Sequence, residues 1–258
     1  MVYCTGDIHG AIYERFNPQM MPGEDQWDEN DVLLVAGDFG AVFYPKMDLF
    51  LDKIALEKQK IEFLEKKRYS ICFCDGNHEN FDRLTSEFPM EERFGGTVRR
   101  IARNVFWLQR SQCYSINGKS FFVLGGAYSI DKGSRLAQDR FILSHYENCS
   151  AQHLSWWPQE LPSEEEYRLA EMNLQACDWT VDYVLTHTCP TELIRLMGYV
   201  PDPHEAPLTA FLDRIWSTAI FSNWLYGHYH LDRAVHPKAT ALYSKLAVLD
   251  TSAPRIIN

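Results

Sequence analysis

The sequence predicts an α/β fold in which parallel strands are covered by helices. Short apolar runs near the N-terminus have the length and composition of buried strands, at residues 2–5, 31–36 and 69–74. Between the last two runs, residues 47–67 carry apolar side chains at helical spacing, namely Met47, Phe50, Leu51, Ile54, Ile61 and Leu64. A strand, a helix and a second strand in succession indicate a parallel crossover.

The middle of the chain has a different character, with short strands joined by turns. Residues 97–124 contain several strand-like runs, and Asn117-Gly118 between two of them is typical of a β-hairpin. Residues 128–162 are polar and aromatic with little periodicity, which predicts a long loop containing a short helix. Ser163 and Glu166 then form a capping-box pattern that opens a helix ending near residue 176.

Three further strands are predicted in the last third of the chain, at residues 181–185, 223–226 and 245–251. No internal repeat, low-complexity tract or linker interrupts the sequence, so we expect residues 1–258 to form one domain. An apolar share of 46% is enough for a sizeable core. No apolar run is long enough to span a bilayer, and the first residues lack the pattern of a secretory signal, so we expect no membrane association.

Charge and cysteine content narrow the partners and the location. A formal net charge of −10 argues against extended binding to nucleic acid or to anionic membranes. Seven cysteines, an odd number without a CxxC pair, predict free thiols in a reducing cytoplasm. The closest pair, Cys72 and Cys74, lies on one face of a predicted strand. The sequence contains no indication of the oligomeric state.

Five apolar runs end in residues of the types that bind metal ions. In chain order these ends are Asp7-Ile8-His9, Gly37-Asp38, Gly76-Asn77-His78-Glu79, Thr186-His187 and Gly227-His228-Tyr229-His230. In open α/β sheets, ligands gather beyond the carboxyl ends of the strands, and glycine beside these residues suits tight loops. Imidazole and carboxylate together favour manganese, iron, zinc or nickel.

Each of these ends has an ordinary explanation when taken alone. Asp-x-His and Gly-Asp occur in plain turns, Asn77 can cap a helix, and a lone His187 is typical of a core histidine. Taken together, however, the strand ends carry five of the nine histidines, and five independent coincidences would be needed. We interpret the remaining histidines as surface or packing residues: His145, His153, His204 and His236.

In this order the motifs DxH, GD, GNHE, H and GHxH resemble the calcineurin-like metallophosphoesterase superfamily, in the form of its bacterial and phage members. The match runs from Asp7 to His230. The resemblance implies a four-layer α/β sandwich of two mixed sheets flanked by helices. It also implies a centre for two divalent metal ions. By motif position, one ion would take Asp7, His9 and His230, the other Asn77, His187 and His228, and Asp38 would bridge them.

The implied reaction is hydrolysis of a phosphate monoester or diester by metal-activated hydroxide. His78 matches the family's catalytic histidine and would act as the general acid. We expect manganese first, with iron, zinc, nickel or magnesium as alternatives. Two divalent ions with the carboxylates of Asp7 and Asp38 leave a local charge of about +2, which attracts a phosphate despite the acidic remainder of the chain.

The sequence departs from the protein phosphatases of this superfamily at two positions. Those enzymes carry an acidic residue that orients the catalytic histidine and an arginine that grips phosphate, where this chain has Ala41 and Val42. The departure weakens two alternatives, a protein phosphatase and a dinucleoside polyphosphate hydrolase. The GNHE motif of this chain nevertheless has the same residues as the motif of the phosphatases. Glu79 or Asp82 is then the candidate to orient His78.

A glycine-rich segment, residues 125–135, resembles a loop that bacterial and phage members place near the metals. We expect Tyr128 and Arg135 to line the substrate pocket, with the Trp156-Trp157-Pro158 segment as a wall. The alternatives are that Arg135 is a solvated surface charge and that both tryptophans pack the loop. Because the sequence lacks a long basic stripe, a small phosphorylated substrate is expected rather than duplex DNA.

Two readings from other functional classes are weaker. A non-catalytic metal-binding scaffold would be expected to have lost ligands, yet all seven candidate ligands and His78 are present. A mononuclear structural site takes four closely spaced Cys or His ligands, whereas these are scattered along the chain and include aspartates.

Overall fold

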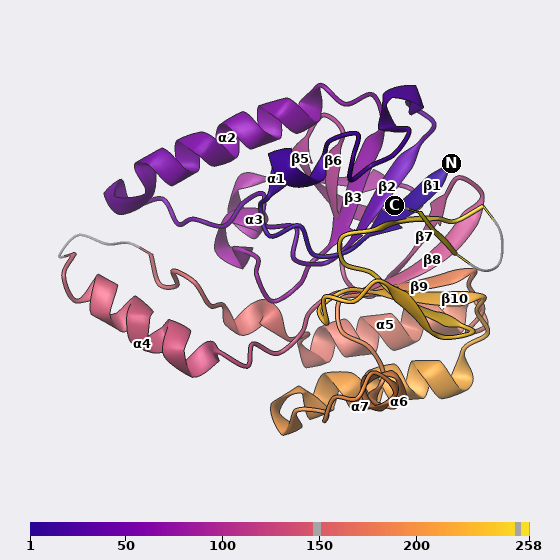
Figure 1. Ribbon diagram of the computed structural model, residues 1–258. Helices are drawn as coiled ribbons and strands as arrows, with labels where there is room; N and C mark the ends of the chain where they lie inside the picture. The colour runs from indigo at the N-terminus through magenta and orange to yellow at the C-terminus, as the bar shows by residue number, and fades with distance from the viewer. Residues whose placement is uncertain (147–150, 251–253, 258) are drawn as a thin grey trace.

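Two mixed β-sheets pack face to face, and helices cover both outer faces (Figure 1). The computed structural model describes residues 1–146, 151–250 and 254–257. Over these residues, the first sheet has eight strands in the order β14-β13-β1-β2-β3-β6-β5-β4. Their bounds are β1 (Val2–Thr5), β2 (Val32–Ala36), β3 (Ser70–Cys74), β4 (Met90–Arg93), β5 (Gly96–Ala102), β6 (Val105–Leu108), β13 (Leu246–Val248) and β14 (Arg255–Ile257). Strands β1, β2, β3 and β6 are parallel, and the outer strands are antiparallel.

The second sheet has the order β11-β12-β10-β9-β8-β7. Its strands are β7 (Gln112–Ile116), β8 (Lys119–Leu124), β9 (Tyr183–Thr186), β10 (Asn223–Tyr226), β11 (Arg233–His236) and β12 (Ala239–Ala241). Strands β8, β9, β10 and β12 are parallel. The β7–β8 hairpin turns at Asn117 and Gly118, whose φ angles of 50° and 73° suit the tight turn predicted from this dipeptide. That prediction is confirmed.

Three hydrophobic clusters fill the spaces between four layers. Along β2, Leu33 and Val35 face the helices over the first sheet, whereas Leu34 faces the second sheet. The middle cluster contains residues of both sheets, including Cys72 and Cys74 on the same face of β3, as predicted. The sandwich of two mixed sheets flanked by helices is therefore confirmed.

The helices divide between the two outer faces (Figure 1). The first face is covered by α1 (Ile12–Arg15), α2 (Leu51–Glu65) and α3 (Phe81–Glu87), and the second by α5 (Glu164–Ala176), α6 (Thr191–Leu196) and α7 (Ala206–Thr218). Helix α4 (Lys132–Leu143) lies to one side of the sheets. Single turns of 3₁₀ helix occur at Glu24–Gln26, Asp48–Phe50, Pro158–Glu160 and Pro203–Glu205. None of the described helices has the length and apolar content to cross a bilayer.

Two helical predictions need correction. The predicted helix over residues 47–67 begins later, at Leu51, and its apolar face is buried only toward its end, since Leu51 is 60% exposed while Leu64 is buried. Residues 128–162 contain a 12-residue helix, α4, and not a short one. The buried side chains of α4 are the polar Arg135 and Asp139, so the sequence has no apolar periodicity to reveal it.

Other elements match the predictions within a few residues. The capping box at Ser163 and Glu166 is present at the start of α5. The predicted strand over residues 181–185 corresponds to β9, and the closing strand to β13, with Thr251 outside the described residues. Helix α7, the edge strands β4, β11 and β14, and strand β12 beside β11 were not predicted.

Candidate metal centre

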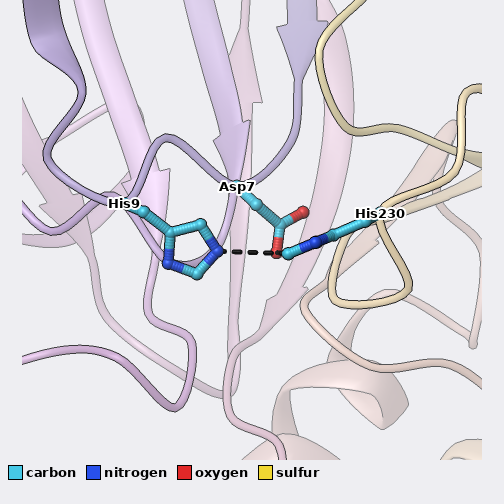
Figure 2. A group of neighbouring side chains, drawn as sticks. All are labelled: Asp7, His9 and His230. Carbon is cyan, nitrogen blue, oxygen red and sulfur yellow. Dashed lines mark hydrogen bonds and ion pairs between the residues drawn. The ribbon is translucent and has the colours of Figure 1, made fainter.

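Loops at the carboxyl ends of five parallel strands converge on one site. Strands β1, β2 and β3 of the first sheet and β9 and β10 of the second lead directly into the candidate ligands. On one side of the site, Asp7, His9 and His230 point toward one another (Figure 2). The Nε2 atoms of His9 and His230 are 3.1 Å apart, and His230 Nε2 is 3.7 Å from Asp7 Oδ1. These donor atoms are close enough to share one metal ion.

Asp38 lies between the two sides of the site. Its Oδ2 atom is 3.7 Å from His9 Nε2 and 3.4 Å from His187 Nε2. Its Oδ1 atom accepts the backbone N–H of His78 at 2.8 Å, and the side chain is buried. Asp38 can therefore offer oxygen to ions on both sides.

Asn77, His187 and His228 gather on the other side of Asp38. His187 Nε2 lies 3.1 Å from Asn77 Oδ1, and the rings of His187 and His228 have centroids 5.0 Å apart. His187 Nδ1 is 2.8 Å from the carbonyl oxygen of Ala36. A donor bond from Nδ1 to this carbonyl leaves Nε2 free to accept a metal ion, as in many metal-binding histidines. The structure thus brings all seven candidate ligands and His78 to one place.

The backbone at the site is strained. His9, Asp38, His228 and His230 have φ angles of 50°, 50°, 65° and 51°, in the left-handed region that non-glycine residues rarely adopt. Such strain costs free energy and clusters at functional sites. The glycines before the ligands are required by close approach. A Cβ atom on Gly37 would lie 2.1 Å from His187 Nδ1, and one on Gly76 would lie 2.0 Å from Asp38 Oδ1.

The electrostatics of the site fit divalent cations. Burial, reinforced by the charge of Asp38, raises the pKa of Asp7 to about 7. Burial alone would raise the pKa of Asp38 too, but the His187 imidazole outweighs it and holds that pKa well below its usual range. Conversely, the Asp38 carboxylate overcomes burial and raises the pKa of His187 to about 10. Buried carboxylates need a compensating charge, which protons supply here and metal ions can supply instead.

The remaining imidazoles are held neutral, as metal binding requires. Burial, assisted by the neighbouring His187, lowers the pKa of His228 to about 3. Burial also lowers the pKa values of His9 and His230. The donor set of carboxylates, neutral imidazoles and one amide therefore fits first-row divalent ions.

A buried arginine that the sequence analysis missed supports the ligand loops. Arg15 donates from Nη1 to the carbonyl of Asp7 at 2.8 Å and from Nη2 to the carbonyl of Tyr243 at 2.5 Å. The Tyr243 ring stacks on His230, with centroids 4.3 Å apart. Arg15 thus links the loop of Asp7 to the residue that supports His230. No spacing in the sequence connects these segments.

The side chain beside His78 is Arg135, and not Glu79 or Asp82. The Nη2 atom of Arg135 lies 2.9 Å from Nδ1 and 2.6 Å from Nε2 of His78. Glu79 instead accepts the backbone N–H groups of Phe39 and Gly40, and Asp82 accepts the indole N–H of Trp157. The prediction that one of these two acids orients His78 is therefore wrong.

Arg135 is held in place and buried, so it is not a solvated surface charge. It is 8% exposed, and its Nε and Nη1 atoms donate to Asp131 Oδ2 at 2.8 Å and to the carbonyl of Ser155 at 3.0 Å. Burial lowers the pKa of His78 to about 4, and the positive charge of Arg135 acts in the same direction against the attraction of Asp38. His78 is therefore neutral near pH 7 in the free protein.

A cavity of about 490 Å³ opens beside the centre, and Tyr128 lines it. Neither Arg135 nor the two tryptophans are among its lining residues. Trp157 is buried against Phe43, with ring centroids 5.7 Å apart. The predicted tryptophan wall is therefore wrong, because at least Trp157 belongs to the hydrophobic core. Ala41 and Val42 are buried in the same core cluster.

Comparison with known proteins agrees with this geometry. The fold and the converging strand-end ligands define a metallohydrolase-like class of protein. A family model described as calcineurin-like phosphoesterase matches residues 1–231, and the chain belongs to that family. Membership assigns the chain to the phosphoester hydrolases and implies that it binds divalent metal.

Among solved structures, the chain is similar to a phosphopantetheinyl hydrolase from Mycobacterium tuberculosis. The two share 16% sequence identity over 94% of this chain and 87% of that chain, with a TM-score of 0.39. No curated protein matches the chain.

Proposed function

We propose that this protein uses two divalent metal ions to hydrolyse phosphate monoesters or diesters. The observation that carries the proposal is the place of Asp38. Its carboxylate lies within 4 Å of His9 on one side and of His187 on the other, where a bridging ligand would stand. Donors for a separate ion are present on each side.

In this proposal, Asp7, His9 and His230 bind one ion, and Asn77, His187 and His228 bind the other. Manganese is the first candidate, and iron, zinc, nickel and magnesium are the alternatives. When bound, a pair of such ions polarises the phosphoryl oxygens and lowers the pKa of water.

The chain's own residues have the following roles. His78, protonated when the anionic substrate is bound beside it, donates a ring N–H, as general acid, to the oxygen of the departing alcohol. Arg135 supplies the cation that Val42 does not, and it holds the ring of His78 in position. Water provides the oxygen that bonds to phosphorus while the ester P–O bond breaks. We further propose a small phosphorylated substrate, a single domain over residues 1–258, and a cytoplasmic location on the strength of the odd cysteine count.

The experiment begins with metal-stripped protein restored with one metal at a time. It is assayed on monoesters, diesters and dinucleoside polyphosphates. We expect activity to return with a first-row divalent ion and to require about two ions per chain. His78→Ala should keep its metal and lose turnover by about 10²- to 10⁴-fold. His145→Ala is the matched control, because this histidine is exposed and lies outside the site. Full activity in His78→Ala would remove the general acid from the proposal.

A further inference from the structure

Two cavities meet at the candidate metal centre. The larger, of about 490 Å³, and a smaller one of about 290 Å³ share His9 and His78 in their walls. A phosphoryl group bound at the centre therefore has room for a substituent on each side. A phosphomonoester has only one substituent and would leave one of these cavities unused.

The larger cavity suits an apolar group without charge. Its wall includes Tyr128, Ile130, Ile194, Tyr199, Val200 and Tyr229. Ile130 and Val200 are 86% and 90% exposed, so apolar side chains stand free near the centre. The stacked rings of Tyr199 and Tyr229, with centroids 5.4 Å apart, form a flat apolar surface.

Charges around the larger cavity disfavour a second anionic group. Apart from Asp38 of the centre itself, its acidic lining residues are Asp131, Asp202 and Glu205, and no lysine or arginine is part of the described lining. The ion pair with Arg135 balances Asp131, but Glu205 is tied only to neutral partners, the Tyr128 amide and the Thr188 hydroxyl. A second phosphate in this cavity would meet like charge without a compensating cation.

The smaller cavity has the opposite character. Lys53 and Lys60 of α2 are part of its wall. Lys60 Nζ donates to the carbonyl of Gly10 at 2.6 Å, which fixes the ammonium beside the loop of His9. The one acidic residue in the described wall, Glu57, is already neutralised by Arg83 at 2.6 Å. The lysines thus give this side of the centre a net positive charge.

We propose that the substrate is an asymmetric phosphodiester. Its apolar, uncharged substituent, best an aromatic one, occupies the larger cavity, and a substituent ending in carboxylate or phosphate faces Lys53 and Lys60. The inference rests on the proposed function. In the reaction, the oxygen of water bonds to phosphorus and one ester bond breaks. One proton of the water ends on the released alcohol, and the other is released to solvent when the phosphate product ionises.

The test compares matched synthetic substrates with the metal-restored protein. The substrates are phenyl propyl phosphate, phenyl 2-carboxyethyl phosphate, phenyl 2-phosphoethyl phosphate, ethyl 2-carboxyethyl phosphate and the monoester phenyl phosphate. We expect the two phenyl diesters with an anionic arm to exceed phenyl propyl phosphate in kcat/KM by about tenfold, as two charge contacts near the surface allow. Their ratio to one another shows whether carboxylate or phosphate is preferred. The ethyl diester should be poorer than its phenyl counterpart. Because phenol is also the better leaving group, only the part of this preference that Tyr199→Ala removes is assigned to the larger cavity.

Variants separate the two cavities. Lys53→Met and Lys60→Met should reduce the preference for an anionic arm, whereas Lys58→Met should not, because Lys58 is 79% exposed on the same helix and outside the cavity. Tyr199→Ala should reduce the preference for phenyl over ethyl and leave the preference for the anionic arm.

Three outcomes bear on the inference. A monoester hydrolysed with higher kcat/KM than every diester would overturn it and leave the proposed function standing. Equal rates for neutral and anionic arms would do the same. Absence of hydrolysis of all substrates with every metal would overturn both.

Discussion

The two sheets contribute different chemistry to the same centre. The loops after β1, β2 and β3 of the first sheet supply both candidate carboxylate ligands, Asp7 and Asp38, together with the imidazole of His9 and the amide of Asn77. The loops after β9 and β10 of the second sheet supply only imidazoles, from His187, His228 and His230. The charge available to balance bound cations therefore comes from one sheet, and three of the four candidate imidazole ligands come from the other. The centre exists only because the sheets pack together.

Each sheet also orients the ligands of the other. The carbonyl of Ala36, at the end of β2, is within hydrogen-bond distance of His187 Nδ1. The backbone N–H of His228 in turn donates to Asp7 Oδ1 at 3.0 Å. Because these contacts cross between the sheets, small shifts in their packing would disturb donors on both sides. The comparison predicts that losing a carboxylate from the first sheet has larger consequences than losing an imidazole from the second.

The largest effect is expected for Asp38→Asn. The substitution removes the charge from a carboxylate that lies within 4 Å of a histidine on each side of the centre. We expect bound metal, measured by elemental analysis, to fall well below two ions per chain, and turnover to fall by at least about 10³-fold. Asp52→Asn, at an exposed position on α2, is the control. Full metal content with normal turnover in Asp38→Asn would contradict the larger role assigned to the carboxylates of the first sheet.

A smaller loss is expected for His228→Ala. A neutral donor is removed from one side only, so one ion should be retained, and the metal content should fall from about two toward about one per chain. Removing a single ligand or its support typically costs about 10- to 100-fold in metal affinity or activity. His236→Ala is the matched control on the same sheet, outside the centre. If His228→Ala and Asp38→Asn lost metal equally, the two sheets would not differ in the way described.

Substitution of Arg135 tests whether helix α4, which lies outside both sheets, contributes to turnover. Arg135→Met removes the cation beside His78, and we expect kcat/KM to fall by about 10²-fold with metal content unchanged. Arg135→Lys should restore part of the loss, because it keeps the charge but not the planar guanidinium. Arg140→Met, exposed on the same helix, is the control. Unchanged kinetics in Arg135→Met would show that α4 adds nothing to the centre.

The smallest effect is expected for Arg15→Met, and it concerns stability more than turnover. The variant removes the guanidinium that donates to the carbonyl oxygens of Gly6 and Asp7 in the ligand loop. We expect the free energy of unfolding, measured by urea titration of metal-free protein, to fall by about 2 kcal/mol. Arg168→Met, at a 60% exposed position, should fall within about 0.5 kcal/mol of the parent protein. A parent-like value for Arg15→Met would show that the loops hold their shape without this arginine.

Several features of the site could be predicted because they are local in the sequence. A short apolar run followed by glycine and a polar residue specifies a strand and the loop at its end, so each of the five loops was found where expected. The residues around the site were harder. Arg135 was placed near the pocket from a resemblance, but its contact with His78, 57 positions away, was not foreseen. The wall assigned to Trp156 and Trp157 was wrong, because an aromatic side chain in a loop packs into a core as readily as it lines a pocket.

By itself, the sequence determined the order of strands and ligand-bearing loops, because periodicity and turn chemistry act over a few neighbouring residues. It also determined which side chains are available as candidate metal ligands, namely two carboxylates together with several imidazoles. Only the tertiary structure decided that Arg15 lies beneath the loop of Asp7, that α4 is anchored by Arg135 and Asp139, and that the two cavities beside His78 differ in charge. These features depend on contacts between residues distant in the chain, and such contacts follow from how the layers pack and leave no local pattern in the sequence.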